Sequence, residues 1–429
     1  MDKKIGLKDA ISIGIGGMVG GGIFAVLGLA VSLAKGGTPL AFLFAGIIAL
    51  LTAYSYAKLS KKYPENGGTV KFVHQQYGNG ILAGGINNLL WISYIVMLAL
   101  YSSAFGSYAA ELISLTDSKK FDIHIFQTSI LTIALLINYL SVKLVSGIES
   151  IAVVIKLLIL IAFLGIGFYG LSINSENIAQ LSPKNWESPI LILSGGMVIF
   201  VAYEGFELIA NSISDLKDKE KNTEKAYFGA VGFVIVLYIL IAIVTVGSLA
   251  FKEIANAQDY VLAKAAEPTL GKIGFTIITI TALISTFSAI NATVLGSGRV
   301  NYDIAEDQEL PRYFCHKFWG KPIGFLITAI LSIILVNLFN LESISTAGSA
   351  GFLLIFAIVN YIAFKKHNEL KSKKSISLIA SVLCLLAFFT LLIQQFHKNK
   401  TGVIVAVGII LFCFIMEYIY KKNATNTAI

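Results

Sequence analysis

The first apolar segment of the chain contains six glycines within the eleven residues from Gly14 to Phe24. Each glycine inside a helix destabilises that helix by about 1 kcal/mol relative to alanine. The run nevertheless lies within an apolar stretch, residues 10–33, that is long enough to cross a bilayer. One interpretation is a helix broken at mid-membrane, whose freed N–H groups bind an anion. The other is close helix packing against Gly16 and Gly20, and the run alone leaves both open.

The composition identifies a membrane protein. Hydrophobic residues make up 56% and charged residues 14% of the 429 residues, whereas a soluble domain carries about 25% charged residues. We therefore predict an all-α polytopic membrane protein with a single transmembrane domain over residues 1–429. Twelve apolar runs are expected to be its transmembrane helices: 8–34, 39–59, 81–112, 124–142, 146–172, 188–214, 226–250, 273–298, 322–339, 342–364, 376–396 and 401–420.

Basic residues predict the orientation of these spans. Lys3, Lys4 and Lys8 precede the first span, so the N-terminus is expected in the cytoplasm. If the spans alternate from there, cytoplasmic segments hold 23 of the 33 Lys and Arg residues and external loops hold 9. We therefore expect a multi-pass protein of the cytoplasmic membrane with both termini inside. The first run is too long for a signal-peptide core and lacks a small-x-small exit site, so no cleavable leader is expected.

The same composition argues against several kinds of partner. No soluble domain is expected to carry the net charge of +8 as a basic face, so we predict the lipid bilayer and no nucleic acid as a partner. The cysteines at 315, 384 and 413 are expected to be free, and no metal-ligand spacing is present. We predict no metal, no cofactor and, in the absence of a nucleophile–base pair within the spans, no enzyme.

A short internal repeat connects two of the predicted spans. The tetrapeptide Gly-Gly-Met-Val occurs at residues 16–19 in the first span and at residues 195–198 in the sixth. Glycine-interrupted first and sixth spans are typical of two five-helix repeats of inverted topology. We predict such repeats over residues 8–172 and 188–364, with broken helices 1 and 6, followed by two additional helices over residues 376–420.

Lys156 lies about ten residues into the fifth span, roughly 15 Å along the helix from the nearest interface. Ionisable residues at this depth are costly and usually functional, and a buried amine can exchange its proton near neutral pH. We therefore interpret Lys156 as a proton-coupling group. The alternative is a permanent structural ion pair with Glu149 or Glu207.

Two carboxylates flank Gly205 in the sixth span. Glu204 and Glu207 are three residues apart and would share one face of a regular helix. Either carboxylate can exchange protons, neutralise Lys156 or contact a cationic ligand. For Glu207, a buried carboxylate that ties the broken helix to its neighbours is the alternative.

Hydroxyl and aromatic side chains complete the candidate set. The hydroxyls of Ser285 and Ser288 in the eighth span are candidates to contact Lys156 across a helix interface, and the alternative is that they bond to their own helix. Four aromatic residues are candidates to gate a pocket, with simple packing as the alternative: Tyr94, Tyr101, Phe200 and Tyr203.

Three motifs, which follow one another along the chain, are similar to segments of one family of membrane proteins. Residues 20–24, Gly-Gly-Gly-Ile-Phe, are similar to its glycine-rich segment in the first span. The loop after the second span contains Tyr-Pro-Glu-Asn-Gly-Gly at 63–68 and Tyr-Gly at 77–78, and the segment after the eighth contains Gly-Arg at 298–299 and Ala-Glu-Asp-Gln-Glu-Leu-Pro at 305–311. Gly-Phe-Glu at 205–207 adds a fourth similarity. The matches extend over about 300 residues, and with them the chain resembles the amino acid–polyamine–organocation transporter superfamily.

The resemblance implies the leucine-transporter-type fold and transport of amino acids. It implies that amides of the glycine run hold the substrate carboxylate and that carbonyls of both broken helices hold its amine. A lysine at position 156 is similar to that of proton-coupled members, where the ammonium takes the place of a sodium ion beside the Gly16 carbonyl and Ser285 or Ser288. The substrate set that follows is Met18, Gly20, Gly21, Gly22, Phe200, Val201, Tyr203 and Glu204. Gly21 lacks the serine hydroxyl of many relatives, and Glu204 replaces an apolar residue that is typical there.

These observations predict a secondary active transporter of amino acids, coupled to protons and working by alternating access. Lys156, Glu207, Gly16, Ser285 and Ser288 form the expected proton-coupling set. The alternatives are an exchanger that is not driven by protons and a transporter-like sensor that binds its ligand without net flux.

Overall fold

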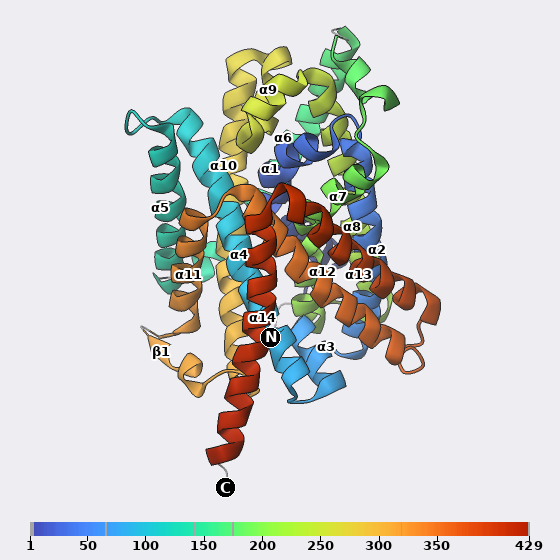
Figure 1. The fold of residues 1–429 in the computed structure, drawn as a ribbon, viewed down its shortest axis with the longest axis vertical. Coiled ribbons are helices and arrows are strands. Elements are labelled where there is room, and N and C mark those ends of the chain that lie inside the picture. The colour runs from blue at the N-terminus through green and yellow to red at the C-terminus, as the bar shows by residue number, and fades with distance from the viewer. Residues whose placement is uncertain (1–3, 65–66, 141, 174–175, 319, 428–429) are drawn as a thin grey trace.

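The computed structural model describes residues 4–64, 67–140, 142–173, 176–318 and 320–427, and helices account for nearly all of them (Figure 1). The α-helices are α1 (Leu7–Ala34), α2 (Thr38–Lys62), α3 (Gly68–Tyr77), α4 (Ile81–Leu112), α5 (Lys119–Leu140), α6 (Val142–Ile173), α7 (Pro189–Val198), α8 (Lys219–Ser248), α9 (Phe251–Asn256), α10 (Val261–Glu306), α11 (Gly324–Leu338), α12 (Leu341–Lys365), α13 (Lys374–Lys398) and α14 (Lys400–Thr427). The 3₁₀ segments are η1 (Ile178–Leu181), η2 (Pro183–Asn185), η3 (Phe200–Asp215), η4 (Gln258–Tyr260) and η5 (Arg312–Cys315). Two strands of two residues each, β1 (Lys317–Phe318) and β2 (Lys321–Pro322), form an antiparallel hairpin.

The prediction of an all-α polytopic membrane protein is confirmed. Within the described residues, ten helices are long and apolar enough to cross a membrane, and the bent pair α7–η3 makes an eleventh span. The remaining expected span corresponds to α11, which has 15 residues and is therefore only about 22 Å long. The apolar core of a bilayer is about 30 Å thick, so the count of twelve stays a prediction.

The helices differ in how deeply they are buried. Almost all of the apolar part of α1 and α4 is covered by other helices, whereas α5, α6, α13 and α14 expose most of theirs. A helix that is apolar on all sides belongs in the interior, and one with a wide exposed apolar face belongs against lipid. The first and third spans therefore form the centre of the bundle.

The first span differs from its prediction. We expected a break in the glycine run, but α1 is a continuous α-helix of 28 residues from Leu7 to Ala34. The glycines instead allow other chain segments to approach closely: a Cβ on Gly17 would lie 2.8 Å from the Gly205 carbonyl oxygen, and one on Gly22 would lie 2.8 Å from the Cα of Ala202. The prediction of a broken helix 1 is wrong for this structure, and the packing interpretation describes it.

The predicted break in the sixth span is confirmed. The α-helix α7 ends at Val198, and the chain turns by 43° into η3. Residues 200–215 then continue as a 3₁₀ helix of 16 residues, whereas 3₁₀ segments longer than three or four residues are uncommon and often mark hinges. The sixth span therefore contains two helical segments of different geometry that meet at Ile199.

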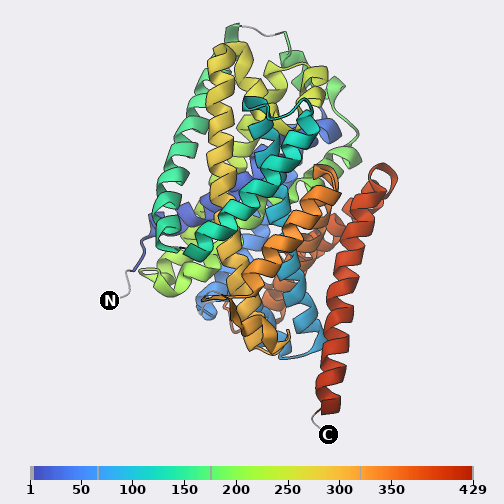
Figure 2. The ribbon, with the colours of Figure 1, turned by 90° about the vertical axis from the view of Figure 1, so that its left-hand side faces the viewer.

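The eighth span is longer than predicted. Its helix α10 contains Pro268 and a kink at Gly271, where φ is +60°, so a short segment precedes the long helix that ends at Glu306. The loop elements α3 and β1 lie at the lower end of the molecule, opposite α9 (Figure 1). Figure 2 shows α14 at the edge of the molecule, extending below the other helices. Before α1, the Ile5 N–H donates to the Asp215 carbonyl (2.9 Å), which ties the start of the described chain to the end of η3.

A buried polar cluster holds the last helix at this lower end. Asn87 of α4 donates to the Glu309 carboxylate (2.6 Å), and its neighbour Asn88 donates to Glu417 of α14 (3.2 Å). Lys421 lies 3.6 Å from Glu417 and donates to the Gln308 carbonyl (2.9 Å). Burial raises the pKa of Glu309 to about 7, with a smaller contribution from the negative charge of Glu417 and against the hydrogen bond from Asn87. The loop after α10 is thus fastened to both α4 and α14.

Candidate functional site

Serines of α12 form hydrogen bonds with the backbone groups that the break in the sixth span leaves without helical partners. The Val198 carbonyl accepts hydrogen bonds from Ser345 Oγ (2.8 Å) and Ser349 Oγ (2.7 Å), and the Val201 N–H donates to Ser349 Oγ (3.1 Å). Irregular backbone at membrane depth requires such partners. Sequence analysis missed both serines, although four hydroxyl residues within positions 343–349 of an apolar span were the available signal.

The glycine run of α1 packs against this break. A Cβ on Gly205 would lie 2.3 Å from the carbonyl carbon of Gly17, so the two backbones are in direct contact. Tyr238 of α8 links the same segments, because its hydroxyl donates to the Met18 carbonyl (2.6 Å) and lies 3.3 Å from the Ala202 carbonyl. Nothing in the sequence distinguished Tyr238 among 18 tyrosines.

The predicted anion donors of α1 are engaged in this structure. Inside a continuous α-helix, each amide N–H donates to the carbonyl four residues earlier, so the amides of Gly20, Gly21 and Gly22 are not free. Side chains also cover the run: the ring of Tyr101 lies 2.1 Å from the Cβ position of Gly21, and the Cβ of Ala289 lies 2.8 Å from that of Gly20. The first span therefore forms a closed surface here, and the expected carboxylate site of free amides is absent from this arrangement.

Three further predicted residues anchor the sixth span. Phe200 is fully buried and packs edge-on against Phe356 of α12, with ring centroids 5.9 Å apart. The hydroxyl of Tyr203 donates to the Phe42 carbonyl of α2 (2.9 Å), and its ring lies 5.2 Å from that of Tyr238. With the Val201 amide held by Ser349, these contacts fix the first turn of η3 against its neighbours.

Glu207 is held from three sides. Its carboxylate accepts hydrogen bonds from Tyr94 of α4, from Thr69 of α3 (3.0 Å) and from Tyr56 of α2 (3.4 Å). The hydroxyls of Tyr56 and Thr69 also lie 2.7 Å apart. Only 3% of the Glu207 surface is exposed, so one buried carboxylate joins η3 to three other helices.

Glu204 has a different environment. It is 4% exposed, and Tyr101 of α4 donates to its Oε1 (3.2 Å). Its Oε2 is buried and accepts no hydrogen bond from any residue that the structure describes. Since the ring of Tyr101 also covers Gly21, this side chain connects Glu204 to the glycine run.

Lys156 lies against the other side of α1. It is 1% exposed, and its Nζ donates to the Gly16 carbonyl (3.1 Å). The structure therefore brings Lys156 and Gly16 together. The side chain of Glu149, the alternative ion-pair partner, lies outside the described residues, and the carboxylate of Glu207 is occupied by hydroxyls.

Ser285 of α10 also contacts α1. Its hydroxyl donates to the Val19 carbonyl (3.0 Å) and contacts the Gly20 carbonyl. Ser288 follows three residues later and is half-buried. Carbonyl oxygens within little more than one turn of α1, at Gly16, Met18 and Val19–Gly20, thus receive donors from α6, α8 and α10.

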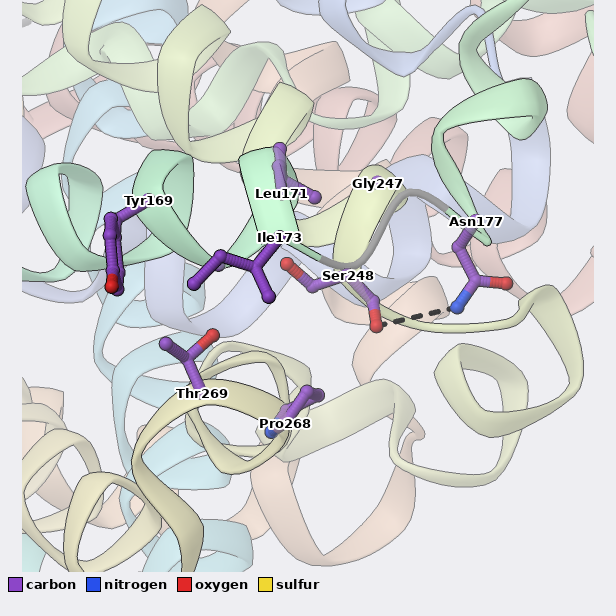
Figure 3. A pocket seen from close by; sticks show the side chains of 9 residues that line it. Tyr169, Leu171, Ile173, Asn177, Gly247, Ser248, Pro268 and Thr269 are labelled. Atoms are coloured by element: carbon purple, nitrogen blue, oxygen red, sulfur yellow. Dashed lines mark hydrogen bonds between the residues drawn. The ribbon is translucent and has the colours of Figure 1, made fainter.

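A separate pocket of about 260 Å³ lies at the end of α6 (Figure 3). It is bounded by Tyr169 and Leu171, by Ser248 at the end of α8, and by Pro268 before the kink of α10, and Asn177 donates to the Ser248 carbonyl across it (3.5 Å). None of its lining residues is charged. It contains none of the predicted site residues.

A bundle of apolar helices, with one span interrupted and buried ionisable side chains beside the interruption, defines a multi-pass membrane protein of the transporter class. The profile of the amino acid permease family matches residues 5–418, and the chain belongs to this family. The members of this family are transporters and not enzymes.

Relatives of known sequence agree with this assignment. The chain is 33% identical to an uncharacterized protein of Methanocaldococcus jannaschii and 30% identical to the inner membrane transport protein YbaT of Escherichia coli, in both cases over 99% of this chain and 98% of the relative. It is 25% identical to the serine/threonine exchanger SteT of Bacillus subtilis, over 87% of this chain and 85% of the relative.

Proposed function

We propose that the protein is a proton-coupled symporter that carries amino acids across the cytoplasmic membrane by alternating access, with both termini in the cytoplasm. The observation that carries the proposal is the buried amine of Lys156. It donates to the Gly16 carbonyl of α1, the helix that packs against the broken sixth span. Its proton-coupling partners are Gly16, Ser285, Ser288 and Glu207. The substrate would bind where α1 meets η3, at Met18, Gly20, Gly21, Gly22, Phe200, Val201, Tyr203 and Glu204.

The coupling follows from the strength of one contact. A charged ammonium makes a stronger hydrogen bond to a carbonyl than a neutral amine does. Protonated Lys156 therefore holds α6 against α1, and loss of the proton weakens this contact and permits α1 to move. Symport further requires that a bound proton and a bound substrate favour the same arrangement of α1, and proton-driven uptake measures whether they do.

Uptake into proteoliposomes tests this mechanism. Wild-type protein is expected to accumulate labelled amino acids when the external pH is lower than the internal pH, and Lys156→Met should abolish accumulation while exchange persists. Lys184→Ala, which removes an exposed lysine of the loop after α6, is the matched control. An unchanged response of Lys156→Met to the pH gradient would remove Lys156 from the mechanism.

Exchange without a proton gradient is the second candidate, because the relative SteT is named an exchanger. In that case wild-type protein would show counterflow at equal pH on both sides and no accumulation with a pH gradient. The two functions are separated by the same vesicles with and without the gradient.

A further inference from the structure

Two tyrosine–glutamate pairs connect α4 to η3, and their hydrogen bonding is unequal. Tyr94 contacts Glu207, and Tyr101 contacts Glu204. Glu207 receives three hydroxyl donors, which occupy both of its oxygens. Glu204 receives one, and its Oε2 is buried and accepts no hydrogen bond within the described part of the chain.

A buried carboxylate with an unused oxygen is costly unless a donor reaches it. Since the described residues supply Glu204 with one donor, the neutral hydroxyl of Tyr101, the carboxylate retains an acceptor position for a charged donor. An ammonium group is the strongest ligand for that position, because it combines opposite charge with several N–H donors.

The contact with Tyr101 places the carboxylate of Glu204 beside the candidate substrate site. The ring of Tyr101 occupies the space next to Gly21, and its hydroxyl bonds Glu204. Rotation of this one side chain would uncover Gly21 and release Oε1 of Glu204 in the same movement. The space vacated would be bounded by the helix that is expected to bind a substrate carboxylate and by an acidic side chain.

We infer that Glu204 binds a positively charged group on the side chain of the substrate, so that the site selects cationic amino acids. This inference rests on the proposed function. The ammonium of the substrate replaces the hydroxyl of Tyr101 as the donor to Glu204. The main alternative is that Glu204 carries a proton and never contacts the ligand, in which case its removal changes the pH dependence and leaves selectivity unchanged.

Equilibrium binding in detergent separates these roles, with lysine and norleucine as the probes, because norleucine has a side chain of similar length without the ammonium. Wild-type protein should bind lysine at least about tenfold more tightly than norleucine, since a hydrogen bond to a charged group contributes roughly 1.5–3 kcal/mol. Equal affinity of the wild-type protein for lysine and norleucine would overturn the inference, and this measurement requires no variant.

Glu204→Gln is the decisive variant, because the amide oxygen still accepts from Tyr101 while the charge is removed. It should lose the preference for lysine and keep its affinity for norleucine within about threefold. Glu306→Gln, at an exposed position near the end of α10, is the matched control and should behave as wild type. A retained lysine preference in Glu204→Gln, or a change confined to the pH dependence, would refute the assignment.

Flux measured on the same preparations keeps the two proposals apart. Lysine binding that depends on Glu204 without flux into vesicles would contradict the symporter and support the inference. Proton-driven uptake of neutral amino acids with no preference for lysine would contradict the inference and support the symporter.

Discussion

Alanine at position 205 should force apart the two backbones that form the centre of the candidate site. The new Cβ would lie 2.3 Å from the carbonyl carbon of Gly17 and 2.4 Å from the amide nitrogen of Met18, whereas ordinary contacts are 3.4–4 Å. Both obstacles are backbone atoms, so no side-chain rotation relieves the clash, and α1 must move by roughly 1 Å. Overpacking of this kind typically costs about 1–3 kcal/mol, and we expect Gly205→Ala at the upper end of that range.

Thermal unfolding in detergent, followed by tryptophan fluorescence, measures this effect. The expected decrease in Tm is on the order of a few degrees for a chain of this size. Gly165→Ala is the control, because Gly165 lies on an exposed part of α6 with no described heavy atom within 4 Å of its Cβ position. That variant should equal or exceed wild type, since alanine favours helix over glycine by about 1 kcal/mol. Equal Tm values for Gly205→Ala and wild type would refute the close contact between α1 and η3.

Three further predictions concern single contacts. Ser349→Ala should destabilise the protein by about 1–3 kcal/mol, because the Val201 amide loses its acceptor. Ser297→Ala, which removes a hydroxyl bonded within its own helix, should change Tm little by comparison. Tyr238→Phe should cost about 1 kcal/mol through loss of the donor to α1, and a Tm equal to wild type would contradict that contact. The raised pKa of Glu309, about 7, means that between about pH 5 and 7 the folded protein retains a proton that the unfolded chain has released. Stability should therefore fall as pH rises from about 5 to 7 and level off above that, and Glu309→Gln should flatten that dependence in a Tm–pH series.

The membrane helices could be predicted because the signal is local. Apolar length identifies a span without knowledge of its neighbours, and the third and tenth predicted spans lie within one residue of α4 and α12 at each end. The sixth span could be predicted as broken for the same reason, since its glycines and charged residues interrupt an apolar run. The extension of α10 before Gly271 was missed, because Lys264 and Glu267 make that segment polar.

The state of the first span could not be predicted, because the deciding contacts are distant in sequence. The glycine run fits a break and a packing surface equally well. The choice between them depends on Gly205, Ala202 and Tyr101, which lie 80 or more residues away and occupy the space beside the run. The serines that satisfy the break at Ile199 also come from a helix about 150 residues further on.

These contacts together explain why a continuous α1 is compatible with a site for transport. The helix amides are internally bonded and Tyr101 covers Gly21, so this arrangement is closed to a ligand at the glycine run. Opening it requires Tyr101 to leave and the helix to loosen where glycines make loosening least costly. Donors from α6, α8 and α10 hold carbonyls within little more than one turn of α1, and Lys156 is the one amine among Lys156, Tyr238 and Ser285. If the proposed function is correct, the glycine run supplies the ability to open, and Lys156 determines when it opens.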